Sequence, residues 1–523
     1  MADEILEREV KQKLSDLYAG EGRVRVESEI VLPEYKEEAQ RILRMTTLTR
    51  VNSKNVYLRA QNLICEVEGT VSFQVLYLTD RRGEKGVISS FLSQENFSYT
   101  FKIPYHGEEM DTDQVTAFVE LVPEGAVSKL QGPRKISTRC DVAVALDLKC
   151  NTPVALYPAF VAQDIKTSGK KAGIARLAAV HTEEMNFSET ISLPKAYLPI
   201  QEVCEMDVSL IAQNVKAEEG GVRFTGLCDL HCSYTAQGED LFVSFYQPIE
   251  FEKSVGVADV TSSHFCQIHM TPNFLKASTD VNEEGENKNI LFELSFTCEV
   301  LAFENQETDV VEDAFSTESD LVIRKEREQL EEILGMSDFS VTVRDSVPLK
   351  NPSVFRAEGI LSSVEFKNSY WEEGKIVMEG KLSYRYLGVE ETGEMKNYEE
   401  SYDFRCDWTP EKFSLPAGEE CRIEISGLVR SLDLEPEGEK MRLRFDLGGS
   451  VTVYLCRSVE IVSDMERGEK WNSARGGILY VYPQEGESLW DIAKKYHVAP
   501  EEISRENGLE GVDLPTFLRV LPF

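Results

Sequence analysis

The stretch Gly69-Thr-Val-Ser-Phe-Gln-Val-Leu-Tyr77 decides the fold class, because large apolar residues mostly alternate with small or polar ones along it. A period of two residues is typical of a β-strand with one face buried and the other solvated. Two later stretches repeat the arrangement, Gly226-Leu-Cys-Asp-Leu-His-Cys-Ser-Tyr234 and Gly380-Lys-Leu-Ser-Tyr-Arg-Tyr-Leu-Gly388. In the third stretch the final tyrosine is missing. The sequence therefore predicts a strand-rich protein built from three copies of one unit.

The same order of signals surrounds each of these stretches. Each copy opens near an apolar residue followed by proline, and the glycine lies 36, 32 and 32 residues after Pro33, Pro194 and Pro348. Each copy then ends in a long strand pattern, at residues 136–148, 290–303 and 441–455. A unit of about 120 residues is large enough to bury a sandwich-type core of its own. The expected fold class is mainly β, with three tandem β-sandwich-like repeats.

The segments between and around the copies complete the predicted division of the chain. Residues 1–20 show apolar residues on one side of a helical projection, and Lys325 to Leu334 has the pattern of a short exposed helix. The predicted segments are an amphipathic N-terminal helix (1–30), repeat 1 (31–150), a connector (151–184), repeat 2 (185–303), an acidic connector with a short helix (304–336), repeat 3 (337–462), a flexible linker (463–477) and a small C-terminal domain (478–523).

The C-terminal domain has a different pattern, with the order strand, helix, helix, strand. A strand-like run over 479–482 precedes a turn at Glu485-Gly486, and Ser488 is placed as the N-cap of a helix over 489–496. Pro500 suits the first turn of a second helix that Asn507-Gly508 ends, and a second strand is expected over 516–521. The order and the motif Gly-x-Ser-Leu-Trp-x-Ile-Ala resemble a LysM domain, which is a binding module.

The resemblance to LysM implies a binding groove between two loops, one after the first strand and one after the second helix. Backbone groups at such turns suit the acetamido groups of N-acetylglucosamine. We expect Trp490 to pack in the core about twice as often as it would contact ligand. This chain departs from the family at Glu487, where aspartate is more usual, and at 514–517, where the familiar Pro-Gly-Gln is absent. The implied groove residues are Gly486, Glu487, Ser488, Leu489, Trp490, Asn507, Gly508 and Leu509.

Three β-rich repeats ahead of one LysM domain resemble the spore-coat morphogenetic proteins that carry tandem SPOCS domains before a LysM domain. The resemblance implies a non-enzymatic adaptor in the mother-cell cytoplasm, at the forespore surface, which uses its LysM domain to dock the coat basement-layer ATPase SpoIVA. Other coat proteins are further implied partners. The alternative is recognition of peptidoglycan, an N-acetylglucosamine polymer or a lipid-linked cell-wall precursor. A cell-wall hydrolase is disfavoured, because neither a secretion signal nor a catalytic constellation is visible.

Charge and composition restrict the partners and the compartment. The chain has 56 basic and 91 acidic residues, a net charge of −35, which disfavours nucleic acid and anionic lipid surfaces as ligands. The charged N-terminus contains no apolar secretion signal, and no window of the sequence reaches the length of a membrane span, so we expect a cytosolic protein. Eleven scattered cysteines then act as small buried hydrophobes.

Candidate chemistry is sparse. Cys228, His231 and Cys232 are the strongest metal candidate, but on a strand both cysteines face one side and the histidine the other, so we expect structural cysteines. No catalytic residue, metal or cofactor is predicted. Trp371 and Trp408 are expected in the core of the third repeat. Trp471 in the linker is expected either to pack on the LysM domain or to anchor a contact.

Overall fold

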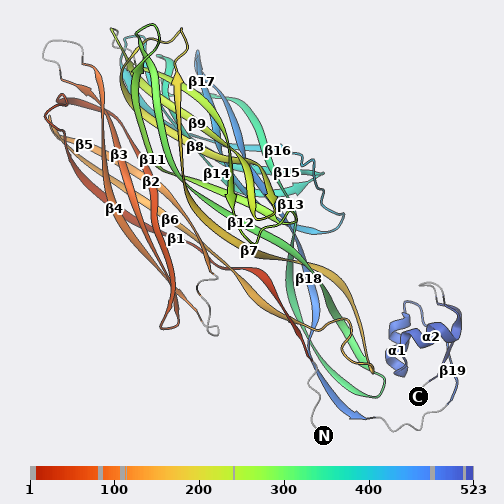
Figure 1. Ribbon diagram of the computed structural model, residues 1–523. Helices are drawn as coiled ribbons and strands as arrows, with labels where there is room; N and C mark the ends of the chain where they lie inside the picture. Colours follow the sequence, from red (N-terminus) through yellow and green to blue (C-terminus); the bar gives the residue numbers. More distant parts are fainter. Residues whose placement is uncertain are drawn as a thin grey trace.

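The computed structural model describes residues 7–80, 86–105, 112, 115–238, 242–470, 477–509 and 514–521. Strands make up nearly all of the described chain, and two short helices lie near its C-terminal end. Figure 1 shows long strands running side by side, with the small helical domain beyond one end of them. The predicted mainly-β fold class is confirmed.

The first unit consists of six strands in two three-stranded antiparallel sheets. One sheet has the order β1-β6-β5 and the other the order β2-β3-β4, so the sixth and third strands are central. The strands of unit 1 are β1 (Glu9–Val31), β2 (Ala39–Arg59), β3 (Asn62–Thr79), β4 (Ile88–Pro104), β5 (Thr116–Gly132) and β6 (Lys135–Leu156).

The same topology recurs twice, with sheets β7-β12-β11 and β8-β9-β10 in unit 2, and β13-β18-β17 and β14-β15-β16 in unit 3. The strands of unit 2 are β7 (Ile165–Ser192), β8 (Ile200–Glu218), β9 (Gly221–Ala236), β10 (Phe242–Gly256), β11 (Phe265–Val281) and β12 (Asn287–Ser316). The strands of unit 3 are β13 (Ser319–Pro348), β14 (Val354–Glu372), β15 (Lys375–Glu390), β16 (Met395–Trp408), β17 (Glu420–Glu437) and β18 (Lys440–Lys470).

The glycine-led stretches of the sequence are the central strands β3, β9 and β15. Each glycine pairs across the sheet with a phenylalanine, Gly69 with Phe97, Gly226 with Phe251 and Gly380 with Phe404. A Cβ atom at any of the three glycines would lie within 2.7 Å of that ring. The glycine therefore makes room for the ring, and each ring is buried in the core of its unit.

The predicted N-terminal helix is wrong. Residues 9–31 form β1, which pairs antiparallel with β6 from Glu9 opposite Leu156 to Val31 opposite Lys135. The apolar residues at helical spacing do not form a helix, because strand β6 supplies a full row of backbone hydrogen-bond partners to this segment. A window of local sequence does not reveal these distant partners. Of the residues assigned to the helix, 1–6 lie outside the described residues.

The predicted connectors are strands as well. Residues 151–184 belong mostly to β6 and β7, and 304–336 belong to β12 and β13, so the short helix expected at Lys325 to Leu334 is part of a strand. The linker predicted over 463–477 is likewise strand β18 up to Lys470. Residues 471–476, which include Trp471, lie outside the described residues.

These extended strands form a stalk, the name used below for residues 9–16 with 149–156, 165–177 with 303–316, and 319–333 with 454–470. All three units contribute to its apolar interior, which contains Val154, Leu156, Ala172, Ile174, Val310, Leu330, Val459 and Ile461. Asn151 and Asn305 join neighbouring units, because each side-chain amide pairs with both backbone groups of one residue in the next unit, Leu177 and Ile333 respectively, at 2.8–3.0 Å. The segments predicted as connectors therefore supply an apolar core that the three units share.

A second junction lies where the sandwiches themselves meet. Arg44, Glu205 and Gly359 are each the sixth residue of the second strand of their unit, in β2, β8 and β14. The buried Arg44 guanidinium pairs with the Glu205 carboxylate and donates from Nη1 to the Gly359 carbonyl oxygen at 2.5 Å. Equivalent strand positions of the three units therefore meet at one place. Neither helix in the described part of the chain is long and apolar enough to cross a membrane.

Candidate binding domain at the stalk tip

The C-terminal domain pairs strand β19 (Leu479–Val481) with β20 (Leu518–Val520) beside the helices α1 (Leu489–Tyr496) and α2 (Pro500–Asn507). Ser488 caps α1: its hydroxyl accepts from the Asp491 backbone N–H at 3.2 Å, and the Asp491 carboxylate accepts from the Ser488 N–H at 2.9 Å. Gly508 ends α2 with φ of +61°, a conformation that favours glycine. The predicted helices and their caps are confirmed.

The inner faces of these elements form a small apolar core. Its buried members are Phe315, Val481, Ile492, Ala493, Val498, Ile503, Leu518 and Val520. Phe315 belongs to β12 of unit 2, so the stalk contributes a side chain to the core of the C-terminal domain. The domain is therefore seated on the stalk tip rather than independent of it.

Helix α1 carries the polar part of this seat. The Trp490 indole Nε1–H donates to Asp313 Oδ2 at 2.8 Å, and Lys494 Nζ lies 2.7 Å from Asp313 Oδ1. The Phe315 ring packs edge-on against Trp490 with centroids 5.0 Å apart. Burial opposes ionisation of Asp313, but the hydrogen bonds from Lys494 and Trp490 prevail and lower its pKa. Trp490, one of the residues of the predicted groove, is half-buried at this contact with the stalk.

The structure brings the first wall of the predicted groove together as a turn before α1. Gly486 has φ of +84°, and nothing in the described part of the structure lies within 4 Å of where a Cβ would stand. The Glu487 carboxylate accepts from the Gln484 backbone N–H at 2.9 Å, which closes the turn. The hydroxyl of Ser488 is used in the helix cap, and Leu489 packs partly buried on the core. Open space at this wall therefore lies over Gly486.

The second wall follows α2 and is similarly committed to holding the fold. The Asn507 amide donates to the Ile503 and Arg519 carbonyl oxygens, both at 2.8 Å, and accepts from the Arg519 N–H at 2.7 Å. Gly508 is open to the outside among the described residues, and the Leu509 N–H bonds back to Ser504. Asn507 is therefore a brace between α2 and β20, and its amide has little left to offer a ligand.

Residues 484–519 match the family model of the LysM domain. They are a LysM domain. No curated protein and no solved structure matches the chain. The LysM match indicates that this end of the chain is a module for binding peptidoglycan or another glycan. The match covers this domain, and the three β units lie outside the matched residues.

A second candidate is the Cys228, His231 and Cys232 group, which the structure separates as the strand alternation predicts. Both cysteines are buried in the core of unit 2, and burial raises the pKa of each thiol to about 12. His231 lies on the other face of β9, next to Asp207 of β8 and Tyr246 of β10 in register. Among the described residues, no group of three or more His, Cys, Asp or Glu is arranged to hold a metal ion.

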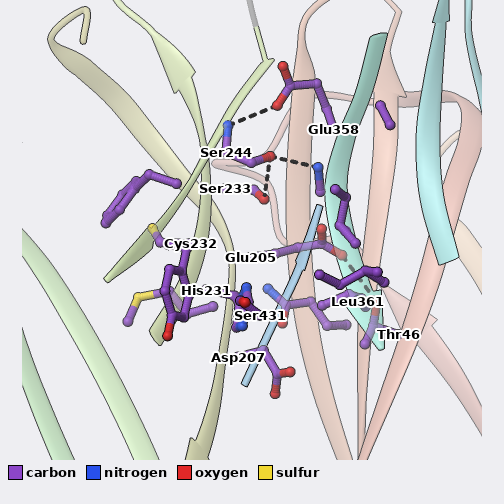
Figure 2. Close-up of a pocket in the computed structure, with 18 of the residues that line it drawn as sticks. Thr46, Glu205, Asp207, His231, Cys232, Ser233, Ser244, Glu358, Leu361 and Ser431 are labelled. Atoms are coloured by element: carbon purple, nitrogen blue, oxygen red, sulfur yellow. Dashed lines mark hydrogen bonds between the residues drawn. The ribbon is translucent and has the colours of Figure 1, made fainter. Parts of the chain in front are cut away.

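His231 lines a cavity of about 340 Å³ between the three units, which sequence reasoning did not anticipate. Figure 2 shows Ser244 between Glu358 and Ser233, which also line the cavity. The Ser244 N–H donates to Glu358 Oε2 at 3.1 Å, and the Ser244 hydroxyl lies 3.1 Å from that of Ser233. Burial raises the pKa of Asp207, with His231 opposing the shift. The lining comes from residues up to about 390 positions apart in sequence, between Thr46 and Asp433, so no local signal marks it.

Proposed function

We propose that this protein is a non-enzymatic adaptor that presents a LysM binding module at the end of a rigid three-unit β body. The observation that carries the proposal is the seat of the LysM domain on the stalk, where Phe315 enters its core and Asp313 bonds α1. A binding module joined in this way is held at a defined distance and orientation from the three sandwiches. A tethered sugar-binding module would need no such seat.

The partner we propose is a coat basement-layer ATPase of the SpoIVA type, with the chain acting as a spore-coat morphogenetic protein of the SipL type. Three tandem β units before one LysM domain support this assignment, as does the commitment of Ser488 and Asn507 to structural hydrogen bonds. The proposed place of action is the mother-cell cytoplasm, at the forespore surface. Each β unit adds a separate face, so that several weak contacts on a polymerised layer gain avidity.

The LysM match itself favours a second candidate, binding of peptidoglycan, N-acetylglucosamine polymer or a lipid-linked precursor. The open positions at Gly486 and Gly508 leave room for a ligand whose acetamido groups bond backbone atoms. Both candidate functions use the LysM domain, so one binding experiment that offers both ligands distinguishes them.

The full-length chain is titrated in parallel with the purified ATPase and with N-acetylglucosamine oligomers, with calorimetric or optical readout. The proposal expects saturable binding of the ATPase and none of the oligomer. Leu489→Ala, which truncates a half-buried side chain at the groove wall, should weaken binding of a ligand that occupies the groove. Binding of the oligomer alone would replace the adaptor reading with glycan recognition.

A further inference from the structure

The outer face of the LysM sheet carries most of the exposed large apolar side chains in the described part of the C-terminal domain. It consists of Ile478, Tyr480 and Tyr482 from β19 and its flanks, and of Phe517 and Arg519 at β20, and is called the outer sheet face below. The four apolar side chains are 51–65% exposed, whereas Val481, Leu518 and Val520 of the opposite face are buried. Phe517 stands between the tyrosines, with ring centroids 5.9 Å from Tyr480 and 6.4 Å from Tyr482. Contiguous exposed apolar side chains of this kind are typical of interaction sites.

The intramolecular seat does not use this face. Helix α1 makes the contacts with Asp313 and Phe315, and Figure 1 shows α1 on the side of the domain toward the stalk and β19 on the far side. The outer sheet face is therefore directed away from the body of the protein. A partner bound there would not compete with the stalk.

The charge pattern of the face identifies the kind of partner. Neither residues 477–484 nor residues 514–521 contain an aspartate or glutamate, although the chain has 91 acidic residues. Depletion of charge with enrichment in tyrosine, phenylalanine and arginine is the composition of a protein–protein interface core. Around most of the protein an acidic partner would be repelled, and here it would not be.

Arg519 adds an unsatisfied donor at the centre of the face. It lies opposite Tyr480 in the sheet register, and its Nε atom is buried and has no hydrogen-bond partner within the described part of the chain. The Arg519 side chain as a whole is half-exposed, and a carboxylate is the acceptor that a guanidinium binds most strongly. An aliphatic or aromatic side chain beside an aspartate or glutamate on the partner would match both features.

We infer that the outer sheet face is the surface by which the LysM domain docks a partner protein, one that presents an apolar side chain flanked by a carboxylate. The predicted groove residues, at the turn before α1 and at the end of α2, are not members of this face. This inference rests on the protein-partner function proposed above, and it names the residues that make the contact. Because Tyr480, Tyr482 and Phe517 project outward, their replacement leaves the buried core untouched.

The test is a binding titration of the purified SpoIVA-type ATPase with the full-length chain and four variants. Tyr480→Ser/Phe517→Ser and Tyr482→Ser remove rings, Arg519→Met removes the cation, and Tyr35→Ser is the control, because Tyr35 is an 80% exposed aromatic residue between β1 and β2. The double variant should raise Kd at least tenfold, and Tyr35→Ser should leave it unchanged. Arg519→Met should also flatten the dependence of Kd on salt, since it removes a charge pair.

Each outcome decides the inference. If the wild type binds the ATPase and all outer-face variants bind it with the same Kd, the outer sheet face is not the docking surface, whereas the adaptor function stands. Absence of wild-type binding would overturn the proposed partner and the inference with it. Loss of N-acetylglucosamine oligomer binding in the same variants would assign the face to glycan, and a change from dimer to monomer in sedimentation would assign it to a second copy. Unaltered thermal unfolding of the variants is the control for folding.

Discussion

Replacing Asp313 should release the LysM domain from the stalk. Asp313 accepts the Trp490 indole N–H at 2.8 Å and meets Lys494 at 2.7 Å, so one side chain holds two polar contacts of the seat. A hydrogen bond to a charged acceptor contributes about 1.5–3 kcal/mol. Lys494 is 41% exposed, so its ion pair contributes about 0.2–1 kcal/mol after solvent screening. We therefore expect Asp313→Ala to weaken docking by about 2–4 kcal/mol, and Asp313→Asn by less, because the amide oxygen still accepts from Trp490.

The indole N–H of Trp490 reports this contact directly. The chain has four tryptophans, so a nitrogen-15 tryptophan spectrum contains few indole signals, and Trp490→Phe identifies the one from Trp490. In Asp313→Ala that signal should move toward the position of a solvated indole and exchange rapidly with water. Glu312→Gln is the matched control, because Glu312 is the neighbouring carboxylate and pairs with the exposed Lys170. A Trp490 signal that stays in place in Asp313→Ala would refute the assignment of the seat to Asp313.

The pH dependence of docking follows from the lowered pKa of Asp313. A carboxylate whose pKa is lower in the docked state stabilises docking fully above its unperturbed value of about 3.9, and this contribution is lost as pH falls through the lowered pKa. The Trp490 signal should therefore be unchanged between pH 6 and pH 8. It should shift toward the undocked position only in strong acid, and a transition near neutral pH would contradict this origin.

Three further outcomes test the body of the molecule. Arg44→Met should cost about 3–5 kcal/mol of unfolding free energy by leaving Glu205 buried without its cation, and adding Glu205→Gln should restore part of it, as measured by denaturant titration. Gly226→Ala should destabilise the protein, because the new Cβ would meet the Phe251 ring, and a Phe251→Leu background should reduce the loss in melting temperature. Asn305→Ala should cost about 1–3 kcal/mol, since it leaves two backbone groups of the stalk without partners, and should speed hydrogen exchange there.

The parts of the fold that sequence predicts are those whose signals are local. The bounds of α1 follow from Ser488 and from the apolar spacing between Leu489 and Tyr496, and the structure has the same bounds. Alternation in the three glycine-led stretches predicts the central strands, because every second side chain must enter the core of its own unit. Each of these predictions concerns fewer than ten consecutive residues.

The failures all concern pairing over long distances. The apolar residues Val10, Leu14 and Leu17 fit a helix, yet β1 pairs with β6 more than 100 residues later. The segments predicted as connectors have a polar sequence because each stalk strand exposes one side to solvent. Their other side is buried against residues of the other units. The sequence leaves open whether Trp490 packs in the core or contacts a ligand, because Asp313, its hydrogen-bond partner, lies 177 residues away in the chain.

The junction of the three units shows why repetition of topology did not preserve repetition of sequence. Convergence of equivalent positions would place three identical side chains together if the units were identical, and three buried arginines or three glutamates would repel. The chain instead places Arg44, Glu205 and Gly359 at this position, a cation, an anion and a residue without a side chain. Gly359 is required to be small, because a Cβ there would lie 2.7 Å from the Arg44 guanidinium. The three units are therefore not interchangeable at this junction, because each supplies the one residue that its two neighbours can accommodate.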